Sequence, residues 1–98
     1  MNRVRAVSMA AQTRRTIQGL VRRGRWTFLV QAERGRQEAQ VSLAELGAAL
    51  SEGEIVEVYE KQPGMTAYLL LGFAGRQPLH ALCALRERPG QVIVMMVM

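Results

Sequence analysis

The stretch that decides the fold is residues 54–98, EIVEVYEKQPGMTAYLLLGFAGRQPLHALCALRERPGQVIVMMVM. Proline presets the second position of a turn and glycine accepts the positive φ that follows, so three sites in this stretch read as turns. They are Gln62-Pro63-Gly64, Gly75-Arg76-Gln77 and Glu87-Arg88-Pro89-Gly90. The segments they delimit have the usual length of strands, and short links between neighbours predict an antiparallel meander. The expected strands are Glu54–Lys61, Thr66–Ala74, Pro78–Arg86 and Gln91–Met98.

The expected strands differ in how their apolar residues are distributed. The segment 54–61 carries four charged residues, which suits an edge strand protected against stray pairing. The segments 66–74 and 91–98 are apolar on both faces, and both faces then need cover. Since one layer of helices covers only one face, we expect a homodimer that associates through the sheet and is closed by a two-fold axis. The residues expected in or near that contact are Met95, Met96, Val97 or Met98.

The first part of the chain predicts a helix followed by a strand. Apolar residues at helical spacing form one stripe of a segment that Ser8 can cap and Gly24 can end. The next segment, Arg25–Val30, is rich in aromatic and branched residues and is expected to be a strand. The segment Gln31–Gln40 is polar and is expected to form a weak helix or a loop, with Gly35 arguing against much regularity.

A capping box marks the start of a second clear helix. Ser42 and Glu45 stand three residues apart before an apolar run, and Gly53 ends the helix. The expected order is therefore an N-terminal helix, a strand, one or two short helices and a four-stranded antiparallel meander. This is an α+β fold in a single domain over residues 1–98, with residues 1–7 expected to be flexible.

Composition excludes several classes of protein. No apolar run approaches the roughly 18 residues of a membrane span. The arginine-rich N-terminus resembles a transit peptide, but the helix there is useful to the fold and the apolar core of a secretory signal is missing, so we expect a cytoplasmic protein. Cys83 is the single cysteine and is expected to be a buried apolar residue. With one cysteine, one histidine and no aspartate, no metal site or cofactor is expected.

Charge is distributed unevenly along the chain. Up to Arg36 there are nine arginines and one glutamate, a net charge of +8, whereas the remainder carries −3. Arginine forks match phosphate geometry, so RNA or DNA is the polyanion to expect. The alternative is a solvated helix face in a protein that uses arginine in place of lysine. The candidate nucleic-acid-binding residues are Arg14, Arg15, Arg22, Arg23, Arg34 and Arg36.

Several segments of the chain resemble a known family. Gly53–Tyr59, Leu69–Phe73, Gly75–His80 and Val92–Val94 look like the successive strands of an uncharacterised bacterial family, the domain of unknown function numbered forty-two fifty-eight. The resemblance covers about Ile17–Val97, and Pro-Leu-His after a glycine turn is its most specific element. The family's element order is similar to that of the RelE and BrnT toxins, which cleave RNA. The resemblance thus implies RNA or an antitoxin-like protein as a partner, by fold analogy.

The chain departs from the family pattern after the first strand. Members usually carry a His-Ala pair, then Arg-Met and a second arginine. In this chain Ala32 fits, but the histidine is Gln31, the first arginine falls on Gly35 and the second on Ala39. Glutamine does not titrate near neutrality as histidine does. If the family histidine is a general acid or base, this chain has lost it.

His80 is the remaining candidate catalytic residue. Cleavage of RNA at the 2′-hydroxyl requires a base, an acid and a cation for the phosphorane charge. A lone histidine at the start of an apolar strand is more often structural than catalytic. The residues that would complete a catalytic set with His80 are Arg34, Arg36 or Arg76, with Glu57 or Tyr59 assisting.

Two functions remain open. The first is a non-catalytic binding module, with its positive helix on nucleic acid or an acidic partner and its sheet on a second copy. The alternative is a small metal-independent ribonuclease of the toxin type. The missing family residues favour the binding module.

Overall fold

The computed structural model describes the backbone of residues 3–62 and 65–98, and their side chains apart from those of residues 3–9, 61, 62, 65 and 87. Helices and strands of this part of the chain follow the order α, β, α, α, then four strands. The helices are α1 (Arg3–Arg22), α2 (Val30–Glu38) and α3 (Leu43–Glu52). The strands are β1 (Trp26–Phe28), β2 (Glu54–Gln62), β3 (Met65–Ala74), β4 (Gln77–Glu87) and β5 (Gly90–Val97).

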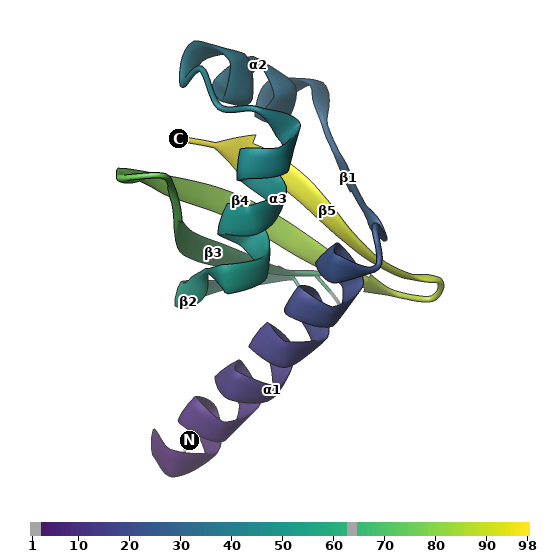
Figure 1. Ribbon diagram of the computed structural model, residues 1–98. Helices are drawn as coiled ribbons and strands as arrows, with labels where there is room; N and C mark the ends of the chain where they lie inside the picture. The colour runs from purple at the N-terminus through teal and green to yellow at the C-terminus, as the bar shows by residue number, and fades with distance from the viewer. Residues whose placement is uncertain (1–2, 63–64) are drawn as a thin grey trace.

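The strands form one mixed sheet in the order β1-β5-β4-β3-β2 (Figure 1). From β2 to β5 each strand pairs antiparallel with the next, which confirms the predicted α+β class and the meander. The short strand β1 pairs parallel with β5, with Trp26 opposite Val92, and so adds a fifth strand at one edge. The acidic strand β2 forms the other edge, as its charges predicted.

Two of the three predicted turns lie within the described residues. Ala74 pairs with Gln77 across the β3–β4 turn, and Glu87 pairs with Gly90 across the β4–β5 turn. The predicted turn at Gln62-Pro63-Gly64 includes Pro63 and Gly64, which lie outside the described residues.

Helix α1 begins earlier than the sequence pattern indicated. It starts at Arg3, so Ser8 lies inside the helix and the prediction that Ser8 caps it was wrong. Residues 3–7 contain arginine, valine and alanine without a helix breaker, so they extend the helix. The predicted end is confirmed: the amide of Gly24 donates to Val21 and that of Arg25 donates to Leu20, the hydrogen-bond pattern of a Schellman motif.

Gly35 lies inside α2 and does not interrupt it. The helix packs against the end of β5, and a Cβ atom at position 35 would stand 2.2 Å from the carbonyl oxygen of Val97. The glycine therefore permits a close helix–strand contact, where the sequence had indicated irregularity. Ala32, on the same helix, is buried.

Helix α3 has the capping box that the sequence predicted. The amide of Glu45 donates to the Ser42 hydroxyl at 3.0 Å, and the amide of Ser42 donates to the Glu45 carboxylate at 3.0 Å. The reciprocal bond lowers the pKa of Glu45 from its ordinary value, chiefly because the Ser42 amide stabilises the charged form.

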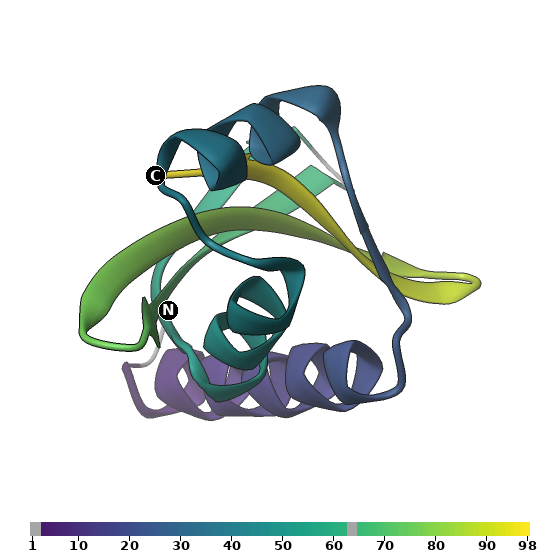
Figure 2. The same cartoon turned by 45° about the horizontal axis from the view of Figure 1, so that its top comes forward.

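The three described helices lie on one face of the sheet, which we call the inner face (Figure 2). Strand residues of that face are buried against the helices, among them Leu70, Ala81, Cys83 and Val94. The helices contribute Ile17, Leu20 and Val21 from α1 and Leu46, Ala49 and Leu50 from α3. In the described part of the chain, these residues form one core between the helix layer and the sheet.

The opposite face of the sheet, the outer face, is apolar as well. Leu69 of β3 stands opposite Leu82 of β4, which stands opposite Met96 of β5, and directly opposed residues share one face of a sheet. Among the described residues no helix covers this face. Phe73 is 58% exposed and Met96 40% exposed. We define the outer face by Leu69, Leu71, Phe73, Leu82, Ile93 and Met96.

Candidate nucleic-acid interface

Arginines from two distant parts of the sequence meet at one end of the domain. The C-terminal end of α1 lies beside the β4–β5 turn (Figure 1). The Arg25 Nε–H donates to the carbonyl oxygen of Gly90 at 2.8 Å, and the amide of Val92 donates to the carbonyl oxygen of Arg25 at 3.0 Å. This contact joins the two arginine-rich segments. We call the resulting group the basic surface: Arg22, Arg23, Arg25, Arg86 and Arg88.

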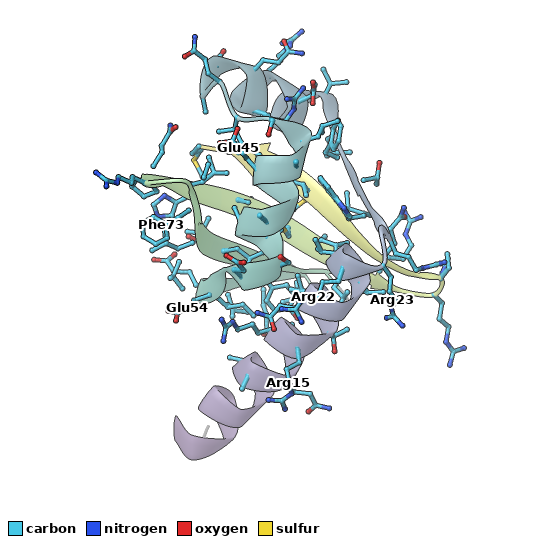
Figure 3. The ribbon with its side chains drawn as sticks, in the orientation of Figure 1. Arg15, Arg22, Arg23, Glu45, Glu54 and Phe73 are labelled. Carbon is cyan, nitrogen blue, oxygen red and sulfur yellow. The ribbon has the colours of Figure 1, made fainter. Side chains whose placement is uncertain are left out.

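All five residues of the basic surface are exposed. Residues 20–25 and 86–90 contain these five arginines and one acid, Glu87, so the two segments carry a net charge of +4. Figure 3 shows Arg22 and Arg23 at the end of α1 nearest the turn, with Arg15 further along the same helix. Arg15 precedes Arg22 by seven residues, so the two lie on one stripe about 10 Å apart.

The sequence pattern identified only Arg22 and Arg23 of this surface. Arg86 and Arg88 were missed because they lie in the half of the chain with excess acid, and Arg25 was missed because the sequence placed it at the start of the predicted strand Arg25–Val30. A local sequence signal for Arg86 and Arg88 was available, because these two arginines flank Glu87 at the predicted β4–β5 turn. Their proximity to α1 depends on the parallel pairing of β1 with β5, which the sequence did not predict.

Arg14 has a structural contact that the sequence did not indicate. Its Nε–H donates to the carbonyl oxygen of Gly53 at 2.8 Å, and its Nη2–H donates to that of Glu52 at 3.3 Å. These carbonyls stand at the C-terminal end of α3, where the helix leaves acceptors without helical partners. Arg14 therefore ties α1 to the end of α3, and its fork is directed at backbone oxygens.

Arg34 and Arg36 lie on α2, away from the basic surface (Figures 1 and 2). Arg36 forms the ion pair with Glu33, and its Nη1–H donates to the carbonyl oxygen of Val41 at 2.8 Å. The hydrogen bond from Arg36 is the main reason that the pKa of Glu33 lies below its ordinary value. Arg34 is exposed. The six predicted arginines therefore fall into two groups: Arg14, Arg15, Arg22 and Arg23 in or directly after α1, and Arg34 and Arg36 on α2.

His80 lies on the outer face, half-buried. Its position is opposite Leu71 of β3, and its backbone exchanges hydrogen bonds with Met98 at 2.9 and 2.8 Å. Arg34 and Arg36 belong to α2, which packs on the inner face. Thus the structure does not bring His80 together with these two predicted cations.

The other predicted partners of His80 are also separated from it. Arg76 stands in the β3–β4 turn, four residues before His80 in sequence, or about 13 Å of extended backbone. Glu57 and Tyr59 lie on β2, with β3 between them and β4. The Tyr59 hydroxyl donates to the Glu57 carboxylate, and this bond raises the pKa of the phenol.

The positions of the degenerate motif lie along α2. Gln31 is exposed, and Ala39 follows the last residue of the helix. Position 35 faces the Val97 backbone so closely that an arginine there would require α2 to move away from β5. The close packing of α2 on β5 therefore depends on the absence of a side chain at this position.

Metal and thiol chemistry find no support at the described residues. Within residues 3–62 and 65–98, no three His, Cys, Asp or Glu side chains gather in a way that could hold a metal ion. Burial raises the pKa of the Cys83 thiol to about 12, and the side chain is fully buried, so it behaves as a small apolar residue. In the same part of the chain, no helix combines the length and apolarity needed to cross a membrane.

Comparison with known proteins adds one match. The model of a family described as a domain of unknown function (DUF4258) matches residues 31–97, more than half of the chain. No curated protein and no solved structure matches. The matched region begins at α2 and includes α3 and β2 to β5, while α1 and β1 precede it.

Proposed function

Because the chain belongs to the DUF4258 family, whose function is unknown, we propose a function from its geometry: the protein is a nucleic-acid-binding module that uses the basic surface. One observation carries this proposal. The contact between Arg25 and Gly90 joins the end of α1 to the β4–β5 turn, and the two segments that meet there carry five exposed arginines.

The chemistry of these side chains favours phosphate as the ligand. Each guanidinium offers a planar fork of donors that fits two phosphate oxygens and keeps its charge at any physiological pH. The arginines come from a helix end, a strand start and a turn, so they present charge from several directions to one polyanion. Contacts of this kind bind the nucleic-acid backbone and carry little sequence preference.

Binding without cleavage is the better supported of the two functions left open by the sequence. The described residue opposite His80 on β3 is Leu71, and the predicted cations Arg34 and Arg36 are on the helix layer. The order of elements is similar to that of the RelE and BrnT toxins, but fold analogy is a weak warrant for cleavage.

The proposal is tested by two double variants of equal net charge. Arg23→Gln with Arg88→Gln removes two arginines of the basic surface, and Arg34→Gln with Arg76→Gln removes two exposed arginines elsewhere. Fluorescence anisotropy with labelled single-stranded RNA and duplex DNA measures binding across a salt series. We expect the wild-type affinity to fall steeply with salt, with a slope of about 0.7 to 0.9 for each phosphate contact.

The two double variants should then differ. The first is expected to weaken binding at about 100 mM salt by about tenfold or more and to flatten the salt slope by one to two contacts. The second should bind nearly as the wild type does. Equal weakening by both variants would show that binding depends only on the net charge of the protein. If the wild type does not bind at low salt, these arginines form a solvated surface without a nucleic-acid ligand.

A further inference from the structure

The outer face of the sheet is a second surface, which meets the basic surface only at Arg86. Leu69, Leu82 and Met96 form a row across the three neighbouring strands β3, β4 and β5. Phe73 extends the apolar surface along β3 and is 58% exposed. Leaving such a surface in water costs about 25 cal/mol for each Å² of apolar area, so a partner that covers it stabilises the protein.

The size of the face is sufficient for a stable interface. The four longer strands, β2 to β5, lie about 4.8 Å apart and span about 19 Å, and eight residues of strand span about 26 Å. The projected area is therefore about 500 Å². A specific interface needs about 500 Å² from each partner at its lower limit and about 800 Å² at standard size. The outer face alone meets the lower limit.

The charges at the margin of the face are compatible with a second copy of the same chain. Glu54 stands opposite Leu71 and Glu57 opposite Leu69, so both carboxylates border the face along β2. Arg86 borders it at the far end of β4, where it stands opposite Gln91. A margin with both signs can pair with itself, whereas a margin of one sign would repel its own copy.

We propose that the outer face binds a second copy of this chain, forming a dimer of two stacked sheets about 10 Å apart. Met96 and Met98, which are 40% and 57% exposed, lie at the C-terminal end of the contact together with Met95. Val97 is excluded from the contact, because its side chain is 4% exposed and belongs to the inner core. The contact meets the basic surface only at Arg86, on its margin, and does not rest on the proposed function.

Sedimentation velocity and matched variants test this proposal. The test variants are Phe73→Glu and Met96→Glu, which place a carboxylate in the outer face. The control is Leu43→Glu. The side chain of Leu43 is 49% exposed, a fraction between those of Met96 and Phe73. It stands in the first turn of α3, in the helix layer. A glutamate is favourable at that helix start, so the control adds the same charge without strain.

We expect the wild type and Leu43→Glu to be dimers between about 10 and about 100 µM, and each test variant to weaken dimerisation by about 100-fold or more. Circular dichroism checks that each variant is folded. The wild-type Tm should rise with protein concentration, as it does for a protein stabilised by association. A monomeric wild type at about 100 µM, or equal dissociation of the control and the folded test variants, would overturn the proposal.

Discussion

Gly72 of β3 lies against the backbone of Ala49 in α3, so closely that a Cβ atom at position 72 would stand 2.3 Å from the Ala49 carbonyl oxygen. The same atom would stand 2.9 Å from the Ala49 carbonyl carbon and 3.0 Å from its Cα. Helix α3 therefore rests directly on β3 at this point. The contact holds because no side chain separates the two backbones.

Gly72→Ala should destabilise the protein, because the added methyl group meets backbone atoms that move only if the whole helix moves. Overpacking of this kind costs about 1–3 kcal/mol, which corresponds to a Tm lower by at least about 4 °C in a domain of this size. The control is Gly19→Ala in α1, where the nearest atom to a new Cβ is 3.9 Å away. That change should stabilise by about 0.5–1 kcal/mol. A neutral Gly72→Ala in thermal unfolding would contradict the described helix–strand contact.

Arg14→Ala should lower stability without changing nucleic-acid binding. The variant loses the hydrogen bonds from the guanidinium to Gly53 and Glu52, and for a half-exposed group we expect about 1–2 kcal/mol in urea unfolding. Arg15→Ala, at the exposed neighbouring position, should change stability by less than about 0.5 kcal/mol. An Arg14→Ala protein of unchanged stability would mean that the α1–α3 tie contributes little.

Local signals predicted the elements of this fold well. The proline and glycine turns after β3 and β4 and the Ser42–Glu45 capping box depend on residues adjacent in sequence. The structure confirmed the ends of the predicted strands within one or two residues. It also confirmed both hydrogen bonds of the capping box. Such signals could not predict that β1 pairs parallel with β5, because the pairing joins residues more than sixty positions apart.

The candidate site shows the same limit. Arginine counts along the chain suggested a patch that would include Arg14 and Arg36, but in the structure both side chains are half-buried and bind backbone carbonyls. The carbonyl groups belong to other segments, so only the folded arrangement reveals these contacts. Arg23 and Arg25 also donate to carbonyls, but their side chains stay exposed. Gly35 is similar: its effect on the chain depends on Val97, which lies at the opposite end of the sequence.

The capping box of α3 should make part of the stability depend on pH. The folded state lowers the pKa of Glu45, so this contribution is fully present above the unfolded value of about 4.5 and is lost as the pH falls through the lowered folded value. The Tm of Glu45→Ala should therefore lie below that of the wild type at pH 7, and the difference should shrink below about pH 4. Glu60→Ala, an exposed glutamate of β2, is the control. A difference between wild type and Glu45→Ala that is the same at both pH values would rule out the carboxylate as its source.

The hydroxyl of the capping box can be tested separately. Ser42→Ala removes the acceptor of the Glu45 amide, and loss of an N-cap costs about 1 kcal/mol, or a Tm lower by about 4–8 °C. Ser51→Ala is the matched control, because its hydroxyl donates to Ala48 in the last turn of the same helix. Similar losses in the two variants would show that the cap has no special role.

RNA should remain intact in the presence of this protein, because within residues 3–62 and 65–98 the structure places the predicted cations Arg34 and Arg36 on α2, away from His80. The reaction needs a base, an acid and a cation within reach of one phosphate. In the structure His80 stands opposite Leu71, and Arg36 of α2 pairs with Glu33 in the helix layer. Gel analysis of labelled RNA incubated with purified wild-type protein and with His80→Ala should show the same intact substrate in both. Cleavage by the wild type that disappears in His80→Ala would assign catalysis to His80, and the nucleic-acid contact would then serve a ribonuclease.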